Sequence, residues 1–168
     1  MKSRYVQYYV EGEDEVKLLN TLKGKMGLIR AGKVQRLNAT THLLTPARLR
    51  TLSQDTMVVL IFDTDAGNPA TLQENLDRLN QCTSVSEIVT IPQVHNLEEE
   101  LLRSCSKIHT IQELLNSKSR SDFKHDLICV SNLDCKLTKH GFQIARFWSE
   151  TPAAPYQNIE NLSAKIKL

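Results

Sequence analysis

Residues 57–62 form the feature that most constrains how this chain folds, a run of six apolar residues that reads MVVLIF. The run is rich in β-branched side chains and has the length of a strand rather than that of a helix. A strand that carries apolar side chains at successive positions has to be buried on both of its faces. The run therefore predicts a central strand in a sheet that is covered on each side.

Strand-like and helix-like segments alternate along most of the 168 residues. This alternation favours an α/β domain with a small, mostly parallel sheet and helices on both faces. We expect one domain over residues 1–150 and a C-terminal tail or short extension over 151–168, which begins with the linker-like TPAAPYQN. Strands are expected at 4–10, at one or two places within 28–37, and at 57–62, 87–91 and 126–130, and helices at 14–23, 46–52, 69–79 and 97–105.

Carboxylates follow two of the expected strands, at the point where each strand ends. Glu11 ends the first strand in VEG, and Asp63 and Asp65 follow the central strand in IFDTDAG. The carboxyl ends of parallel strands meet at one edge of a sheet, so we expect these three side chains to converge. Crowded carboxylates repel one another, and hard divalent cations such as Mg²⁺ or Mn²⁺ relieve that repulsion. The alternative is that acids cap helix N-termini, which is the simplest interpretation of Glu13 and Asp14.

Two short motifs carry a resemblance to a known family, VEGEDEVKLL at 10–19 and VVLIFDTDAG at 58–67. Their order, their separation and the strand–helix alternation from residue 4 to about 131 resemble the TOPRIM domain of topoisomerases, primases and OLD-family nucleases. The resemblance implies a small parallel sheet with helices on both faces. It also implies that Glu11 is a metal ligand or general acid/base and that Asp63 and Asp65 bind Mg²⁺.

Within that family the chain is most similar to the OLD type, whose pattern VEGxxE places a second acid one helical turn after the first. Here that acid is Glu15, which we expect to face the same side as Glu11. The OLD type also has a later acid and a downstream lysine. The resemblance assigns these roles to Glu98, with Glu99 as the second choice, and to Lys124; a solvated helix face is the alternative interpretation of both segments.

Other branches of the family fit less well. Topoisomerases need an additional tyrosine-bearing domain, for which 168 residues leave no room. Primases carry zinc-type cysteine clusters, whereas the four cysteines here lack CxxC or other zinc-like spacing, which is typical of free thiols.

A basic segment follows the first acids. Residues 16–54 contain eight lysines and arginines and no Asp or Glu, although the net charge of the whole chain is only +2. Such a segment is typical of proteins that hold a phosphate backbone without reading its sequence, and a solvated basic face is the alternative. The candidate nucleic-acid-binding residues are Lys23, Lys25, Arg30, Lys33 and Arg36.

The chemistry implied by these features is hydrolysis of phosphodiester bonds in DNA or RNA by a nuclease that uses two Mg²⁺ or Mn²⁺ ions. Lys124 is the candidate for stabilising negative charge that develops on phosphorus. Two alternatives stay open. The first is a non-catalytic TOPRIM module that binds nucleic acid or a regulatory partner. The second is a phosphatase of the haloacid-dehalogenase type, because IFDTD matches the nucleophile strand of those enzymes, although the chain lacks an obvious later pair of aspartates.

Partners and location follow partly from absences in the sequence. OLD-type nucleases usually carry an ATPase domain, but the chain has no GxxxxGK[ST] motif. The resemblance therefore implies a separately encoded ATPase or sensor, in an anti-phage or toxin-like system, or a small stand-alone nuclease, and it leaves a homo-oligomer open. The chain has neither a signal-peptide pattern nor an apolar stretch of roughly 18 residues, so we expect a cytoplasmic protein without membrane contact.

Overall fold

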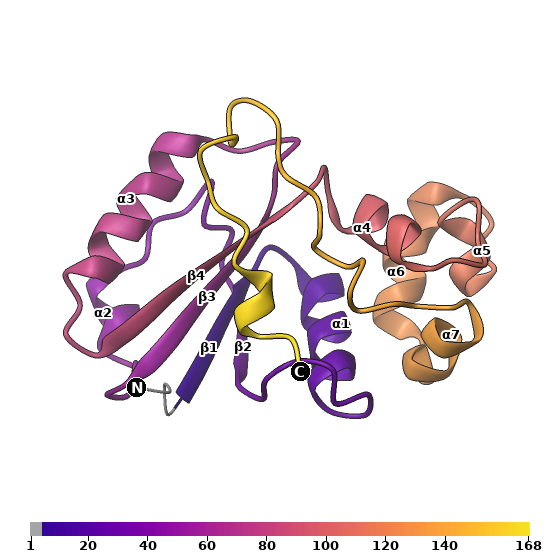
Figure 1. Ribbon diagram of the computed structural model, residues 1–168, viewed down its shortest axis with the longest axis horizontal. Helices are drawn as coiled ribbons and strands as arrows, with labels where there is room; N and C mark the ends of the chain where they lie inside the picture. The colour runs from indigo at the N-terminus through magenta and orange to yellow at the C-terminus, as the bar shows by residue number, and fades with distance from the viewer. Residues whose placement is uncertain (1–4) are drawn as a thin grey trace.

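The computed structural model describes residues 5–168, which form an α/β domain around a four-stranded parallel sheet (Figure 1). The expected fold class is confirmed, and the elements predicted up to residue 105 are present with ends within three residues of the expected ones, except that Arg4, the expected start of the first strand, lies outside the described residues. The strands are β1 (Tyr5–Val10), β2 (Lys33–Arg36), β3 (Thr56–Asp63) and β4 (Val85–Gln93).

The strand order β2-β1-β3-β4 contains a reversal of direction. From β1 the chain moves outward to β2, and it then returns to the other side of β1 to form β3 and β4. All neighbouring pairs are parallel, with Tyr9 of β1 opposite Leu60 of β3. The carboxyl ends of β1 and β3 therefore lie side by side at a topological switch point, which is where ligands bind in open α/β sheets.

Both faces of β3 are buried, as the apolar run predicts. Val59 and Ile61 pack into one core with Leu18 and Leu22 of α1, whereas Leu60 packs into a second core with side chains of α3. Residues 57–62 have exposed fractions of 2% or less. The first four helices are α1 (Glu13–Lys23), α2 (Pro46–Leu49), α3 (Pro69–Asn80) and α4 (Leu97–Ser104). Among the described residues no helix is both long and apolar enough to cross a membrane.

The strand expected at 126–130 is wrong, because residues 126–129 continue a helix and Val130 caps its end. Three helices follow α4 and form a helical cluster beyond α1 (Figure 1): α5 (Gln112–Leu115), α6 (Arg120–Cys129) and α7 (Leu133–Lys139). Ser119 caps α6 by accepting a hydrogen bond from the Asp122 amide. Phe123 and Leu127 lie one helical turn apart and are both buried in the core that includes α1. The strand–helix alternation therefore ends at α4.

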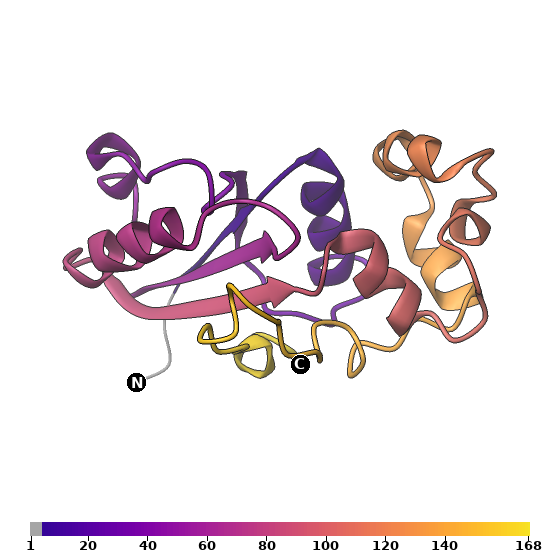
Figure 2. The same cartoon turned by 90° about the horizontal axis from the view of Figure 1, so that it is seen from above.

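The C-terminal segment 151–168 packs along β4 (Figure 2), with Tyr156 in the core that includes α3 and Ile166 in the core that includes α1. Thr90 of β4 donates its hydroxyl to the Glu160 carbonyl, and its own carbonyl accepts the Leu162 amide at 2.9 Å. A short 3₁₀ helix, η1 (Ser163–Lys165), then places Ile166 in the core with no exposed surface. The segment thus contributes to the packing of the sheet.

Candidate metal centre

Three carboxylates meet at the switch point. Glu11 follows β1, Asp63 ends β3, and Glu15 lies in the first turn of α1. One carboxylate oxygen from each lies within 4.8 Å of the other two. The structure therefore brings together three of the acids that the sequence analysis selected, including the pair Glu11 and Glu15.

Gly12 allows the chain to pass from β1 into α1 beneath these acids. Its backbone is extended, with φ at −143°, a conformation that any residue adopts. A Cβ atom at this position would lie 2.7 Å from Oδ1 of Asp14 and 3.3 Å from Oε2 of Glu15, so space rather than backbone angle favours glycine. The Gly12 amide donates a 2.8 Å hydrogen bond to Glu15, which fixes that carboxylate over the start of the helix.

The surroundings of the three acids oppose their negative charge. Burial, followed by repulsion from Asp14 and Asp63, raises the pKa of Glu15 to about 9. Burial, followed by repulsion from Glu11, raises the pKa of Asp63 to about 8. The pKa of Glu11 is also raised, mainly by burial. A divalent cation would remove this penalty, and carboxylate oxygens are the ligands that Mg²⁺ and Mn²⁺ prefer, so the residues present fit such an ion.

The other two predicted ligands lie at the edge of this cluster. Asp65 accepts a 3.0 Å hydrogen bond from the side-chain amide of Asn96, and its charge raises the pKa of both Glu11 and Asp63. Glu98, in the first turn of α4, also contributes to the raised pKa of Asp63. Neither belongs to the group of three that lies within ligand distance.

Glu99, the second choice for this role, forms a 2.9 Å ion pair with Arg120. Its carboxylate therefore already has a cationic partner on α6.

Lys124 reaches the site although it lies on a helix and not beside a strand. Its Nζ is 3.7 Å from Oδ1 of Asp14 and 3.6 Å from the position that a Cβ atom at Gly12 would occupy. Partial burial alone lowers the pKa of this lysine, but the neighbouring carboxylates together raise it above its ordinary value. The ammonium group is therefore a stable positive charge at the rim of the cluster.

Sequence reasoning missed two neutral residues of the site, Gln93 and Asn96. Gln93 ends β4 and donates to Asp63 at 2.7 Å, and its side-chain oxygen accepts the indole N–H of Trp148 at 3.2 Å. The signal was present in the sequence, because both polar residues follow a buried strand, as the acids do. Neutral amides carry no charge that would distinguish them in the sequence as ligands of a cation.

Most of the predicted nucleic-acid-binding residues lie away from the carboxylates. Lys23 is the last residue of α1, ten residues and roughly 15 Å along the helix from its start at the site. Lys25 forms a 3.6 Å ion pair with Asp134, and Arg30 contacts Met57 near the start of β3. Lys33 begins β2 at the amino end of the sheet.

Arg36 is the exception among these five. It ends β2, at the same edge of the sheet as the acids, and forms a 3.2 Å ion pair with Glu13.

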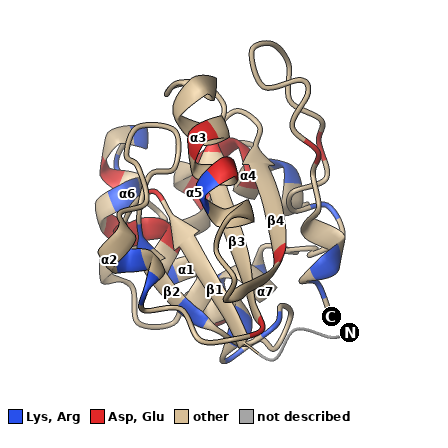
Figure 3. Cartoon of the chain, turned by 90° about the vertical axis from the view of Figure 1, so that its left-hand side faces the viewer, with Lys and Arg blue, Asp and Glu red and all other residues tan. Residues whose placement is uncertain are grey.

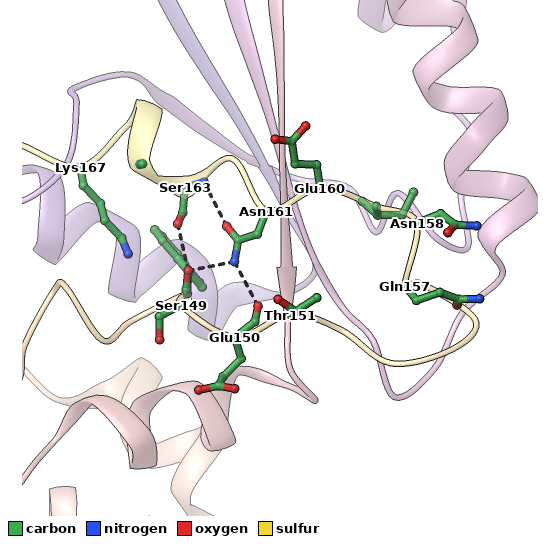
Figure 4. Close-up of a pocket in the computed structure, with 12 residues that line it drawn as sticks. Ser149, Glu150, Thr151, Gln157, Asn158, Glu160, Asn161, Ser163 and Lys167 are labelled. Atoms are coloured by element: carbon green, nitrogen blue, oxygen red, sulfur yellow. Dashed lines mark hydrogen bonds between the residues drawn. The ribbon is translucent and has the colours of Figure 1, made fainter.

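A separate cavity of about 590 Å³ lies against the C-terminal segment (Figure 4). Asn161 donates from its side chain to the backbone carbonyls of Trp148 and Glu150, and Ser163 donates its hydroxyl to the Trp148 carbonyl. These polar groups stabilise the segment itself. Through Trp148 they also support Gln93, and thereby the position of Asp63.

No family model matches the chain, and neither a curated protein nor a solved structure matches it. A function has to be inferred from the geometry and chemistry of the carboxylates.

Proposed function

We propose that the chain is a Mg²⁺- or Mn²⁺-dependent nuclease of the TOPRIM type that hydrolyses phosphodiester bonds of DNA or RNA. The observation that supports this is the meeting of Glu11, Glu15 and Asp63 within 4.8 Å at the switch point of a parallel sheet. The two motifs that resemble the family supply these acids. A separately encoded ATPase or sensor that activates the nuclease is part of the proposal.

The residues of the site have distinct roles in this proposal. Asp63 and Glu15 hold the cation, Glu11 lies within 4.8 Å of both, and Asp65 lies beside them. When bound, the ion supplies Lewis-acid activation of water and stabilises charge on the phosphate. Attack by water forms one P–O bond and breaks the bond to the leaving sugar oxygen, which takes up a proton from solvent. Glu11, the strand-end carboxylate beside these two ligands, accepts the proton that water loses.

Lys124 acts on the phosphate side of the same reaction. Its ammonium donates to a non-bridging phosphate oxygen as negative charge grows there. The side chain is 60% exposed, so it reaches solvent and substrate while the carboxylates keep it protonated.

The decisive experiment is a cleavage assay on supercoiled plasmid and on transfer RNA with Mn²⁺, combined with calorimetric titration of Mn²⁺. The double variant Asp63→Asn/Asp65→Asn is expected to abolish both cleavage and Mn²⁺ binding. A matched control, Glu74→Gln/Asp77→Asn, removes two acids from α3 and should behave as the wild type. Cleavage that survives the first double variant would overturn the proposal.

One observation favours the alternative of a non-catalytic module. Glu15 already accepts hydrogen bonds from the Gly12 amide at 2.8 Å and, weakly, from Gln93 at 3.4 Å, so part of the cluster is satisfied without a cation. That alternative predicts nucleic-acid or protein binding with neither Mn²⁺ affinity nor cleavage. The same titration and assay therefore separate the two functions.

A further inference from the structure

A groove starts at the carboxylates and runs along the edge of the sheet between α2 and β2. Its first hollow, of about 460 Å³, has Glu11 in one wall, with Arg36, His42 and Arg48 among the other lining residues. A second hollow, of about 550 Å³, shares Arg36 and Arg48 with the first and extends to Thr51. Two guanidinium groups thus line the whole groove. In its first hollow Glu11 is the only acidic residue among the described lining residues.

Arg48 is held in place without a carboxylate. Its Nη1 donates a 3.0 Å hydrogen bond to the Arg36 carbonyl, and its guanidinium carbon lies 5.8 Å from the centroid of the Tyr9 ring. Within residues 5–168 it forms no ion pair. The remaining donors of a fixed guanidinium are therefore ready for a planar or tetrahedral anion such as phosphate.

Arg36 has a partner that it can exchange. Its ion pair with Glu13 is 3.2 Å long, but both side chains are about 60% exposed. Exposed pairs contribute little to stability because solvent and salt screen them. A phosphate entering the groove can therefore take the place of Glu13 at low energetic cost.

We propose that this α2–β2 groove binds the sugar–phosphate backbone of the nucleic acid next to the phosphate being hydrolysed, an inference that rests on the proposed function. Arg36 and Arg48 contact successive phosphates, and the strand passes from them to Glu11. Figure 3 faces this side of the molecule and shows basic segments at α2 and β2. The contacts are to the backbone, so they carry affinity and register but no sequence preference.

Nucleic acid bound in the groove follows a different path from the one that the basic segment 16–54 predicts. Lys23 and Lys25 lie at the far end of α1, beside the helical cluster, whereas Arg36 and Arg48 lie at the carboxyl edge of β2. A strand that lies over Lys23 and Lys25 would not enter the groove. The two paths therefore predict different sensitive residues.

Binding is measured by fluorescence anisotropy with labelled DNA and RNA strands of about 20 nucleotides, in buffer that contains Ca²⁺ and a series of salt concentrations. Arg36→Gln/Arg48→Gln is expected to raise Kd about tenfold or more and to reduce the salt slope by about 1 to 2, one counterion for each lost phosphate contact. Lys107→Gln/Lys139→Gln, an equal charge loss before α5 and at the end of α7, should change Kd less than twofold, about the size of a bulk electrostatic effect. Arg36→Gln alone covers the case in which loss of Arg48 disturbs folding, because Arg36 is a surface residue.

Three results would overturn the groove proposal: an unchanged Kd and salt slope in the Arg36 and Arg48 variants, an equal loss of affinity in Lys23→Gln/Lys25→Gln alone, or binding of inorganic phosphate without binding of strands. Failure of the groove proposal is distinguishable from failure of the nuclease proposal. Wild-type protein that cleaves, together with Arg36 and Arg48 variants that bind and cleave equally well, refutes the groove alone. Binding that depends on these arginines without any cleavage refutes the nuclease alone.

Discussion

The side-chain amide of Gln93 donates a 2.7 Å hydrogen bond to Oδ1 of Asp63 and so joins the carboxyl ends of β4 and β3. The same nitrogen lies 3.4 Å from Oε1 of Glu15, and the side-chain oxygen accepts the indole N–H of Trp148. Gln93 has no exposed surface. A buried neutral donor therefore stabilises two carboxylates that repel each other, without adding charge to the site.

Replacing Gln93 by alanine should weaken both the fold and the site. The change leaves the Trp148 indole without its acceptor and removes a hydrogen bond to a carboxylate, each worth about 1–3 kcal/mol. Because that hydrogen bond lowers the pKa of Asp63, Mn²⁺ affinity near neutral pH should also fall. Urea unfolding and calorimetry measure the two effects. Gln73→Ala, on the exposed face of α3, is the control, and equal behaviour of the two variants would contradict this role.

The metal-free protein should lose stability as the pH rises from about 4 to about 9. The pKa values of Asp63, about 8, and Glu15, about 9, lie above those of the unfolded chain, which are near 4. The folded state therefore holds more protons than the unfolded state in this window, and the free energy of unfolding falls as these protons are released. Asp63→Asn should flatten the decline, and Mn²⁺ should reverse it. Urea unfolding across this pH range checks the sign; a free energy that rises with pH would refute it.

Lys124→Gln should lower the turnover of the proposed reaction by about 100-fold, the usual effect of losing a donor to developing negative charge. Substrate binding should change much less, since the ammonium is one of several cations near the substrate. Steady-state kinetics on the substrate that the cleavage assay identifies separates turnover from KM. Lys118→Gln, an exposed residue just before α6, is the matched control. A change confined to KM would assign Lys124 to binding instead.

Gly67 should tolerate no side chain. Its φ of +81° is in the left-handed region, and a Cβ atom would lie 2.0 Å from Oγ1 of Thr40. Gly27 has a similar φ of +60° but open space around it, so Gly27→Ala measures the backbone strain alone, about 1–2 kcal/mol. Gly67→Ala should lower the free energy of unfolding, measured with urea, by more than Gly27→Ala does. It should also displace the Asp65 loop and weaken Mn²⁺ binding. Equal costs for both variants would show that the loop relaxes.

The C-terminal segment should be needed for stability. Ile166 is fully buried, and Ile166→Ala should lower the free energy of unfolding by about 2–5 kcal/mol through lost burial and a cavity. Leu168, which is 74% exposed, gives the control Leu168→Ala, with a change within about 0.5 kcal/mol. Thermal or urea unfolding compares the two. A small effect of Ile166→Ala would mean that the segment detaches in solution.

The sequence determined the central elements of this protein. Six consecutive apolar residues at 57–62 cannot be exposed on either side, so they required a strand between two layers. Because parallel strands end at one edge, the sequence alone predicts that Glu11 and Asp63 meet. Glu15 was selected by the resemblance to the pattern VEGxxE, and helical spacing after Gly12 places it on the same side as Glu11.

Only the tertiary structure decided what surrounds them. The five residues DLICV suit a strand or a helix equally, and the burial of Phe123 and Leu127 against the core of α1 selects the helix. The basic segment is continuous in sequence, but α1 carries Lys23 away from the site whereas β2 brings Arg36 back to it. The reason is physical: local pattern fixes the period and the end of each element, and only the order of strands and the packing of helices fixes which ends meet.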